Sequence, residues 1–201
     1  MSHTVFDGSA GRLEGYLEEG SVDAGAVLCH PHPLYGGSMD DMVLQAIASP
    51  MTSSSMPVLR FNFRGVGASE GDYDKGEGEV DDLLSAIDHL RSVSPCREVI
   101  VAGYSFGAAV ALKAARTLDC SHLMLVAPPL SLFRGASRPV VPTLVIVGEA
   151  DQLVDSAETA AWFEGAPAVI ESIAGADHFF FGAHDRISQA VAGYLGKHYG
   201  A

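Results

Sequence analysis

Short apolar runs that alternate with segments of helical periodicity constrain the fold of this chain more than any other feature. The runs, rich in Val, Ile and Leu, are residues 26–30, 57–63, 98–104, 122–128, 143–148 and 168–173. Apolar residues recur at helical spacing in residues 40–51, 79–93, 106–118, 156–165 and 185–199. Runs this short and this apolar are typical of strands buried on both faces. The repeated order of strand and helix predicts right-handed crossovers and an α/β fold, with a mostly parallel, doubly wound sheet flanked by helices.

The segment before these runs has a different pattern. Residues 12–19 alternate apolar and polar side chains, which predicts an antiparallel strand at an edge of the sheet. We find no internal repeat, low-complexity tract or interdomain linker in the 201 residues. The chain is therefore expected to form one α/β domain, residues 1–201, that buries roughly 70% of its unfolded surface.

Charge and composition narrow the class of partner. The net charge is −13, and the 12 Lys and Arg residues form no run, whereas nucleic acids and anionic membranes call for clustered basic residues. No apolar run approaches the roughly 20 residues of a membrane helix, and the N-terminus lacks the features of an export signal. The three cysteines show no C-x-x-C spacing and are read as reduced. We expect a cytoplasmic protein with a small-molecule substrate; its oligomeric state is not assigned.

Two segments match Gly-x-Ser-x-Gly, the pattern of a nucleophilic serine on a sharp turn between a strand and a helix. They are GASEG, residues 67–71, and GYSFG, residues 103–107. GYSFG follows an apolar run and leads directly into a helical segment, as this turn requires. GASEG leads instead into GDYDKGEGE, which has no helical periodicity and is interpreted as a glycine-rich turn. The pattern therefore predicts Ser105, and not Ser69, as the nucleophile.

A serine nucleophile needs a histidine base oriented by a carboxylate. Asp151 follows the run at residues 143–148, and His178 follows the run at residues 168–173. Both are expected at the carboxyl edge of the sheet, where Ser105 also lies. Glu149 and Asp155 remain rivals of Asp151, whereas Asp177 is a poor partner because neighbouring side chains generally point apart.

An oxyanion hole requires N–H groups that point at the oxygen on which negative charge develops. One donor is expected from Phe106, the residue after the nucleophile. The other is expected from the loop HPHPLYGGSM, residues 30–39, with Leu34 as first choice and His32 and Tyr35 as alternatives. His30 and His32 lack a third ligand at recognisable spacing, so we expect neither a metal ion nor a cofactor.

Taken together, HPHPLYGGSMDD, FNFRGVGASEG, GYSFGAA, VGEAD and GADHFF resemble the α/β-hydrolase superfamily. More narrowly, they are similar to small lidless bacterial serine hydrolases near the dienelactone hydrolases. The resemblance implies an eight-stranded sheet, or a truncated version of it, and a triad of Ser105, His178 and Asp151. The dienelactone hydrolases carry cysteine at the elbow, so their substrate is not carried over.

The resemblance and the motifs together predict an enzyme that hydrolyses esters through an acyl-serine intermediate. Residues 128–142 are too few for a helical cap domain, which indicates an open pocket and small, soluble esters. A thioesterase, amidase or acyltransferase would use the same triad. A non-catalytic binding protein on a hydrolase scaffold is the alternative of a different class.

Overall fold

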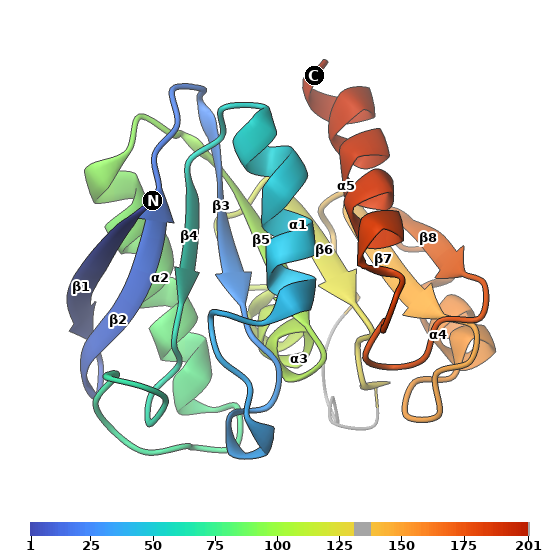
Figure 1. Ribbon diagram of the computed structural model, residues 1–201, viewed down its shortest axis with the longest axis horizontal. Helices are drawn as coiled ribbons and strands as arrows, with labels where there is room; N and C mark the ends of the chain where they lie inside the picture. Colours follow the sequence, from blue (N-terminus) through green and yellow to red (C-terminus); the bar gives the residue numbers. More distant parts are fainter. Residues whose placement is uncertain (131–137, 201) are drawn as a thin grey trace.

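One eight-stranded sheet organises the computed structural model, which describes residues 1–130 and 138–200 (Figure 1). Its strands are β1 (Ser2–Gly8), β2 (Gly11–Glu18), β3 (Ala24–Cys29), β4 (Val58–Phe61), β5 (Glu98–Tyr104), β6 (His122–Val126), β7 (Thr143–Gly148) and β8 (Ala168–Ile173). The strand order is β1-β2-β4-β3-β5-β6-β7-β8, and every pair from β4 to β8 is parallel. The predicted α/β fold with a mostly parallel sheet is confirmed.

Helices cover both faces of this sheet. They are α1 (Met42–Ser53), α2 (Gly78–Val93), α3 (Phe106–Ala114), α4 (Ser156–Phe163) and α5 (His184–Tyr199), and a 3-10 turn, η1 (Pro33–Tyr35), follows β3. Helices α1 and α5 pack side by side on one face, and α2 and α3 pack on the other (Figure 1). Strands β3, β4, β6 and β7 are buried along their whole length, which accounts for their continuous apolar sequence.

The two ends of the sheet differ from the sequence prediction. Strand β2 is antiparallel as expected, but it is not an edge strand because β1 pairs with its outer side. Strand β1 buries only Phe6, so its sequence carries little apolar signal. Strand β8, predicted to be buried on both faces, is the opposite edge, and Ile173 is its only buried residue. The polar residues Glu171 and Ser172 fit that half-exposed position.

The connection from β6 to β7 spans residues 127–142, of which 131–137 lie outside the described residues. The described part of this connection supplies no cap domain over the sheet.

Among the described helices, none has both the length and the apolar character needed to cross a membrane. Cys29, Cys96 and Cys120 are free thiols.

Candidate active site

Ser105 lies at a sharp turn between β5 and α3. Its backbone adopts φ 51° and ψ −113°, a conformation that L residues rarely occupy, and α3 begins at the next residue. Such a conformation costs about 1–3 kcal/mol and persists only where the surrounding structure enforces it. The turn leaves the Ser105 side chain partly exposed at the carboxyl edge of the sheet, although its neighbours on both sides are buried.

The glycines on either side of Ser105 are required by close backbone approach. A Cβ at Gly103 would lie 2.4 Å from the carbonyl carbon of Gly107, and a Cβ at Gly107 would lie 2.1 Å from the main-chain oxygen of Cys29. Both distances are shorter than any real contact of a Cβ atom. The pattern Gly-x-Ser-x-Gly therefore has a steric origin, because α3 begins in direct contact with β5 and with the end of β3.

The structure brings Ser105, His178 and Asp151 into one hydrogen-bonded chain. The Nε2 atom of His178 lies 3.0 Å from Ser105 Oγ, and its Nδ1 atom lies 2.7 Å from Asp151 Oδ2. An ionised Asp151 can only accept, so Nδ1 carries the proton and Nε2 is left as the acceptor for the serine hydroxyl. The three residues follow β5, β8 and β7, as the sequence predicted.

Asp151 is held as a carboxylate. Its side chain is fully buried, and Oδ1 accepts the main-chain N–H groups of Leu153 and Val154 at 2.7 and 2.9 Å. Burial alone would raise the pKa of Asp151, but the hydrogen bonds from His178 and from these two amides outweigh it and lower the pKa. The fixed negative charge keeps the His178 imidazole in one tautomer and orientation.

The rival carboxylates have other roles. Asp155 Oδ1 accepts the N–H of Glu158 and caps α4, and Glu149 is exposed. Asp177 turns back to its own loop, where it accepts the N–H of Phe179 at 3.0 Å. Among these four carboxylates, only Asp151 is hydrogen-bonded to the His178 ring in the described structure.

Tyr104, the residue before the turn, makes a contact that the sequence did not indicate. Its hydroxyl donates to the main-chain oxygen of His178 at 2.9 Å, and burial raises the pKa of this phenol. The bond ties the loop that carries His178 to the strand that carries Ser105. No local pattern could have identified it, because Tyr104 stands at an x position of Gly-x-Ser-x-Gly, which the motif leaves unspecified.

The loop after β3 lies beside the first turn of α3. The His32 ring packs 5.0 Å from the Phe106 ring, centroid to centroid. The N–H of Leu34 donates to His32 Nδ1 at 3.2 Å, and the N–H of Tyr35 donates to the His32 oxygen at 3.0 Å. Among the described residues, the main-chain N–H groups of His32 and Phe106 have no hydrogen-bond acceptor. Leu34, our first choice for the second oxyanion donor, thus has its amide engaged within its own loop.

His30 has a structural position. Its Nδ1 donates to the Pro31 oxygen at 2.6 Å, and its Nε2 accepts the N–H of Phe63 at 3.1 Å. The ring is fully buried, and burial lowers its pKa to about 4 against the smaller opposing effect of the Pro31 bond. Both ring nitrogens are therefore occupied, and the bond at Nε2 joins the segments that follow β3 and β4.

Ser69, in the second Gly-x-Ser-x-Gly, is buried away from any histidine. Its hydroxyl donates to the Asn62 oxygen at 2.7 Å and accepts the N–H of Glu14 at 3.1 Å. The interpretation of GASEG as a turn agrees with this placement. The other histidines also lie elsewhere: His89 bonds Thr4, and His122 bonds Tyr199.

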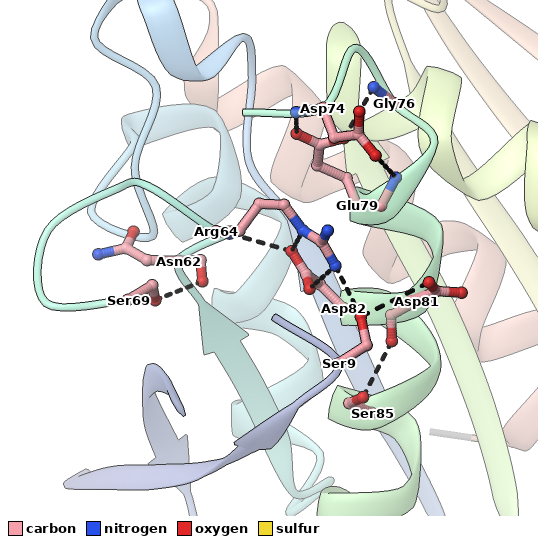
Figure 2. Close-up of polar contacts among 11 residues, drawn as sticks. Ser9, Asn62, Arg64, Ser69, Asp74, Gly76, Glu79, Asp81, Asp82 and Ser85 are labelled. Carbon is pink, nitrogen blue, oxygen red and sulfur yellow. Dashed lines mark hydrogen bonds and ion pairs between the residues drawn. The ribbon is translucent and has the colours of Figure 1, made fainter. Parts of the chain in front are cut away.

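A buried polar cluster joins the segment after β4 to α2 (Figure 2). Arg64 donates from its main-chain N, Nε and Nη2 to the two carboxylate oxygens of Asp82, at 2.7–3.0 Å. Glu79, fully buried, accepts the N–H groups of Asp74 and Gly76 at 2.8 and 2.7 Å. The sequence indicated only the turn at residues 67–71 in this region, because ion pairs to a later helix cannot be recognised from spacing alone.

Comparison with known proteins agrees with this architecture. A family model described as serine aminopeptidase, S33, matches residues 36–133, which include Ser105 but neither Asp151 nor His178. The uncharacterized protein RP471 of Rickettsia prowazekii is 33% identical over 211 residues, covering 97% of this chain and 89% of that protein.

Two solved structures are similarly close. An α/β serine hydrolase homologue from Coxiella burnetii has a TM-score of 0.90 and 30% identity, over 96% of this chain and 97% of that one. XC6422 from Xanthomonas campestris, described as a serine hydrolase without a lid, has a TM-score of 0.89 and 31% identity, over 98% and 94%. Identity at this level over nearly the whole of each chain, with the fold described above, shows that the protein belongs to the lidless serine hydrolases of the α/β-hydrolase superfamily.

Proposed function

We propose that the protein hydrolyses small carboxylic esters through an acyl-serine intermediate. The observation that carries the proposal is the continuous chain from Ser105 Oγ through the His178 imidazole to Asp151, with links of 3.0 and 2.7 Å. In the first half-reaction, His178 Nε2 takes the serine proton as Oγ attacks the ester carbonyl, and then returns it to the departing alcohol. In the second half-reaction, water activated by His178 attacks the acyl-enzyme, which releases the carboxylic acid and regenerates Ser105.

For the oxyanion, we propose the main-chain N–H groups of Phe106 and His32 as donors. Phe106 is the first residue of α3, so its amide has no partner within the helix and lies at the positive end of the helix dipole. His32 is preferred to Leu34 and Tyr35 because the amides of both donate within the loop. A donor already engaged would have to break its bond before it could stabilise the tetrahedral intermediate.

The rim beside the histidine favours an apolar group on the substrate. Phe179 is 55% exposed, and its ring lies edge-on, 5.6 Å from the His178 ring. Phe181 is 77% exposed and lies 5.8 Å from Phe179. Exposed aromatic side chains that adjoin a reactive group are suited to bind apolar parts of a ligand. The sequence also offers Phe133, between β6 and β7, as a candidate for the pocket wall, but it lies outside the described residues.

A fluorophosphonate probe tests the serine directly. The wild type is expected to take up one label per chain, on Ser105, and Ser105→Ala is expected to take up none. Ser69→Ala is the matched control, because it alters the other Gly-x-Ser-x-Gly and should be labelled like the wild type. An unlabelled wild type, or equal labelling of Ser105→Ala, would refute the proposal.

Amide hydrolysis is the second candidate, because the matching family model is described as a serine aminopeptidase. The same three residues would serve, with His178 protonating an amine in place of an alcohol. A p-nitrophenyl ester and the p-nitroanilide of the same acyl group separate the two activities. Preference for the anilide would replace ester hydrolysis by amide hydrolysis and leave the roles of Ser105, His178 and Asp151 unchanged.

A further inference from the structure

The hydroxyl of Tyr73 lies against the ring of His32, 3.1 Å from Nε2. The other ring nitrogen, Nδ1, faces the main-chain N–H of Leu34 at 3.2 Å. An amide N–H can only donate, so Nδ1 must be unprotonated, and a neutral imidazole then carries its hydrogen on Nε2. His32 therefore donates to Tyr73, and the phenol oxygen is the acceptor of this bond.

This assignment leaves the hydroxyl hydrogen of Tyr73 without a partner. Among the described residues, the phenol oxygen has no hydrogen bond other than the one from His32. Tyr73 is half-buried, and its ring lies 5.8 Å from the ring of Phe106. Burial lowers the pKa of His32, against a smaller opposing effect of the Glu79 charge, which favours the neutral ring that the geometry requires. The Tyr73 hydroxyl is thus an unused hydrogen-bond donor that lies beside Phe106, the residue after Ser105.

The segment that carries Tyr73 is held in place by hydrogen bonds to Glu79, a member of the buried polar cluster shown in Figure 2. Glu79 accepts the N–H groups of Asp74 and Gly76, which are the first and third residues after Tyr73. A Cβ at Gly76 would already lie 3.6 Å from the Phe106 ring, so this segment packs closely on the start of α3. A donor that is held in place before the substrate arrives loses little entropy when it forms its bond.

The strand order places Tyr73 on the side of Ser105 that is opposite to His178. The loops after β3 and β4 carry His32 and Tyr73 to one side of β5, whereas His178 and Asp151 follow β8 and β7 on the other side. The leaving alcohol must lie within reach of His178, which protonates it. The other two substituents of the scissile carbon, its oxygen and the acyl chain, are then left on the side of His32 and Tyr73.

We propose that Tyr73 is a specificity-determining residue, whose hydroxyl donates a hydrogen bond to an oxygen atom in the acyl chain of the substrate. The proposal rests on the ester hydrolysis argued above and adds a substrate class to it: acyl groups that carry an ether, hydroxyl or carbonyl oxygen near the scissile carbonyl. A hydrocarbon chain of the same length would leave the donor unpaired in the complex.

Two pairs of matched esters test this preference. In each pair an ether oxygen replaces a methylene group: p-nitrophenyl methoxyacetate against the butanoate, and the 3-methoxypropanoate against the pentanoate. The quantity measured is the ratio of kcat/KM for the ether to kcat/KM for the hydrocarbon ester. Intrinsic reactivity and the fraction of active protein cancel when this ratio is compared between wild type and Tyr73→Phe.

We expect Tyr73→Phe to lower the ratio by about three- to tenfold in at least one pair, the range of one neutral hydrogen bond. Tyr35→Phe is the matched control, because it removes another phenol hydroxyl from beside His32, where the Tyr35 ring packs at 4.7 Å. Its ratios should equal those of the wild type.

A ratio that Tyr73→Phe leaves unchanged in both pairs would overturn the inference, including the case in which all four rates fall by one common factor. An equal fall of the ratio in Tyr35→Phe would overturn it as well. Failure of the hydrolase proposal is a different result, because the wild type would then turn over none of the four esters and its fluorophosphonate labelling would fail.

Discussion

Replacing Gly107 by alanine tests whether the contact between α3 and β3 positions the reactive serine. A Cβ at this position would lie 2.1 Å from the Cys29 oxygen, 2.5 Å from the Cys29 carbon and 2.7 Å from the His30 oxygen. All three atoms belong to the backbone at the end of a buried central strand, so no side-chain rotation can relieve the overlap. An ordinary contact begins at 3.4 Å, and the start of α3 must therefore retreat from β3 by about 1.3 Å.

This retreat should cost more in catalysis than in stability. Overpacking of this kind costs about 1–3 kcal/mol, and the better helix propensity of alanine offsets up to about 1 kcal/mol of it. For a chain of this length we expect Tm to fall by about 2–6 °C. A displacement of about 1 Å at a catalytic centre lowers the rate by about 100-fold, equivalent to about 2.7 kcal/mol of transition-state energy. Ser105 and the Phe106 amide lie in the displaced turn.

The assay is kcat/KM on a p-nitrophenyl ester at a temperature well below both unfolding transitions, with Tm measured by circular dichroism. Gly193→Ala is the control, since its Cβ meets no atom within 4 Å in the exposed middle of α5. It should keep the wild-type rate and gain stability of about 1 kcal/mol, seen as a higher Tm. A Gly107→Ala enzyme with a rate within about threefold of the wild type would refute the positional argument.

Three further perturbations probe the strained turn, the buried ion pair and the buried histidine. Ser105→Gly should unfold about 2–4 °C above Ser105→Ala, because glycine tolerates φ 51° without strain; equal Tm values would contradict this. Asp82→Ala should lower the free energy of unfolding by about 3–5 kcal/mol in urea, because Arg64 is left buried and unpaired. The exposed pair of Arg91 with Asp119 is its control, and Asp119→Ala should cost at most about 1 kcal/mol. Neutral His30, with its pKa lowered to about 4, should contribute stability that is complete above pH 6.5 and is lost as pH falls toward 4. The free energy of unfolding should thereby fall by about 3 kcal/mol. Urea unfolding midpoints of the wild type and of His30→Gln are compared from pH 7.5 to 4.5. An equal pH dependence in the two proteins would contradict this prediction.

The sequence predicted the parts of the site that depend on strand order. Ser105, His178 and Asp151 each follow an apolar run, and parallel strands must end at a common edge, so their meeting could be expected before any coordinates. A separate local requirement excluded Ser69, because no helical segment follows it directly. The roles of these residues in catalysis stay predictions until the labelling experiment is done.

The features that the sequence did not reveal depend on contacts within loops. The amides of Leu34 and His32 differ only in whether the His32 side chain folds back to accept a hydrogen bond, and spacing carries no information on that. Strand β1 was also missed, for a different reason: Phe6 is its only buried residue, so its sequence carries little apolar signal. The bond between Tyr73 and His32 joins residues 41 positions apart, which no local pattern could predict.

Without a lid, the loops after β3 and β4 must themselves hold the hydrogen-bond donors of the site in position. An enzyme that closes over its substrate can exclude water and assemble its donors on binding, whereas an open site must hold its donors in place beforehand. The buried groups beneath the loops are suited to hold them, because His30 bonds the main chain after β4 and Glu79 bonds the segment that carries Tyr73. The Arg64–Asp82 pair ties the start of the loop after β4 to α2. Burying these charges is costly, and replacement of such pairs by apolar side chains is often neutral or stabilising in other proteins. A role in positioning the loops explains the presence of these buried charges better than a contribution to stability alone. If that role is correct, a conservative change such as Glu79→Gln must lower kcat by a larger factor than the loss of folded protein, measured by urea unfolding, can account for.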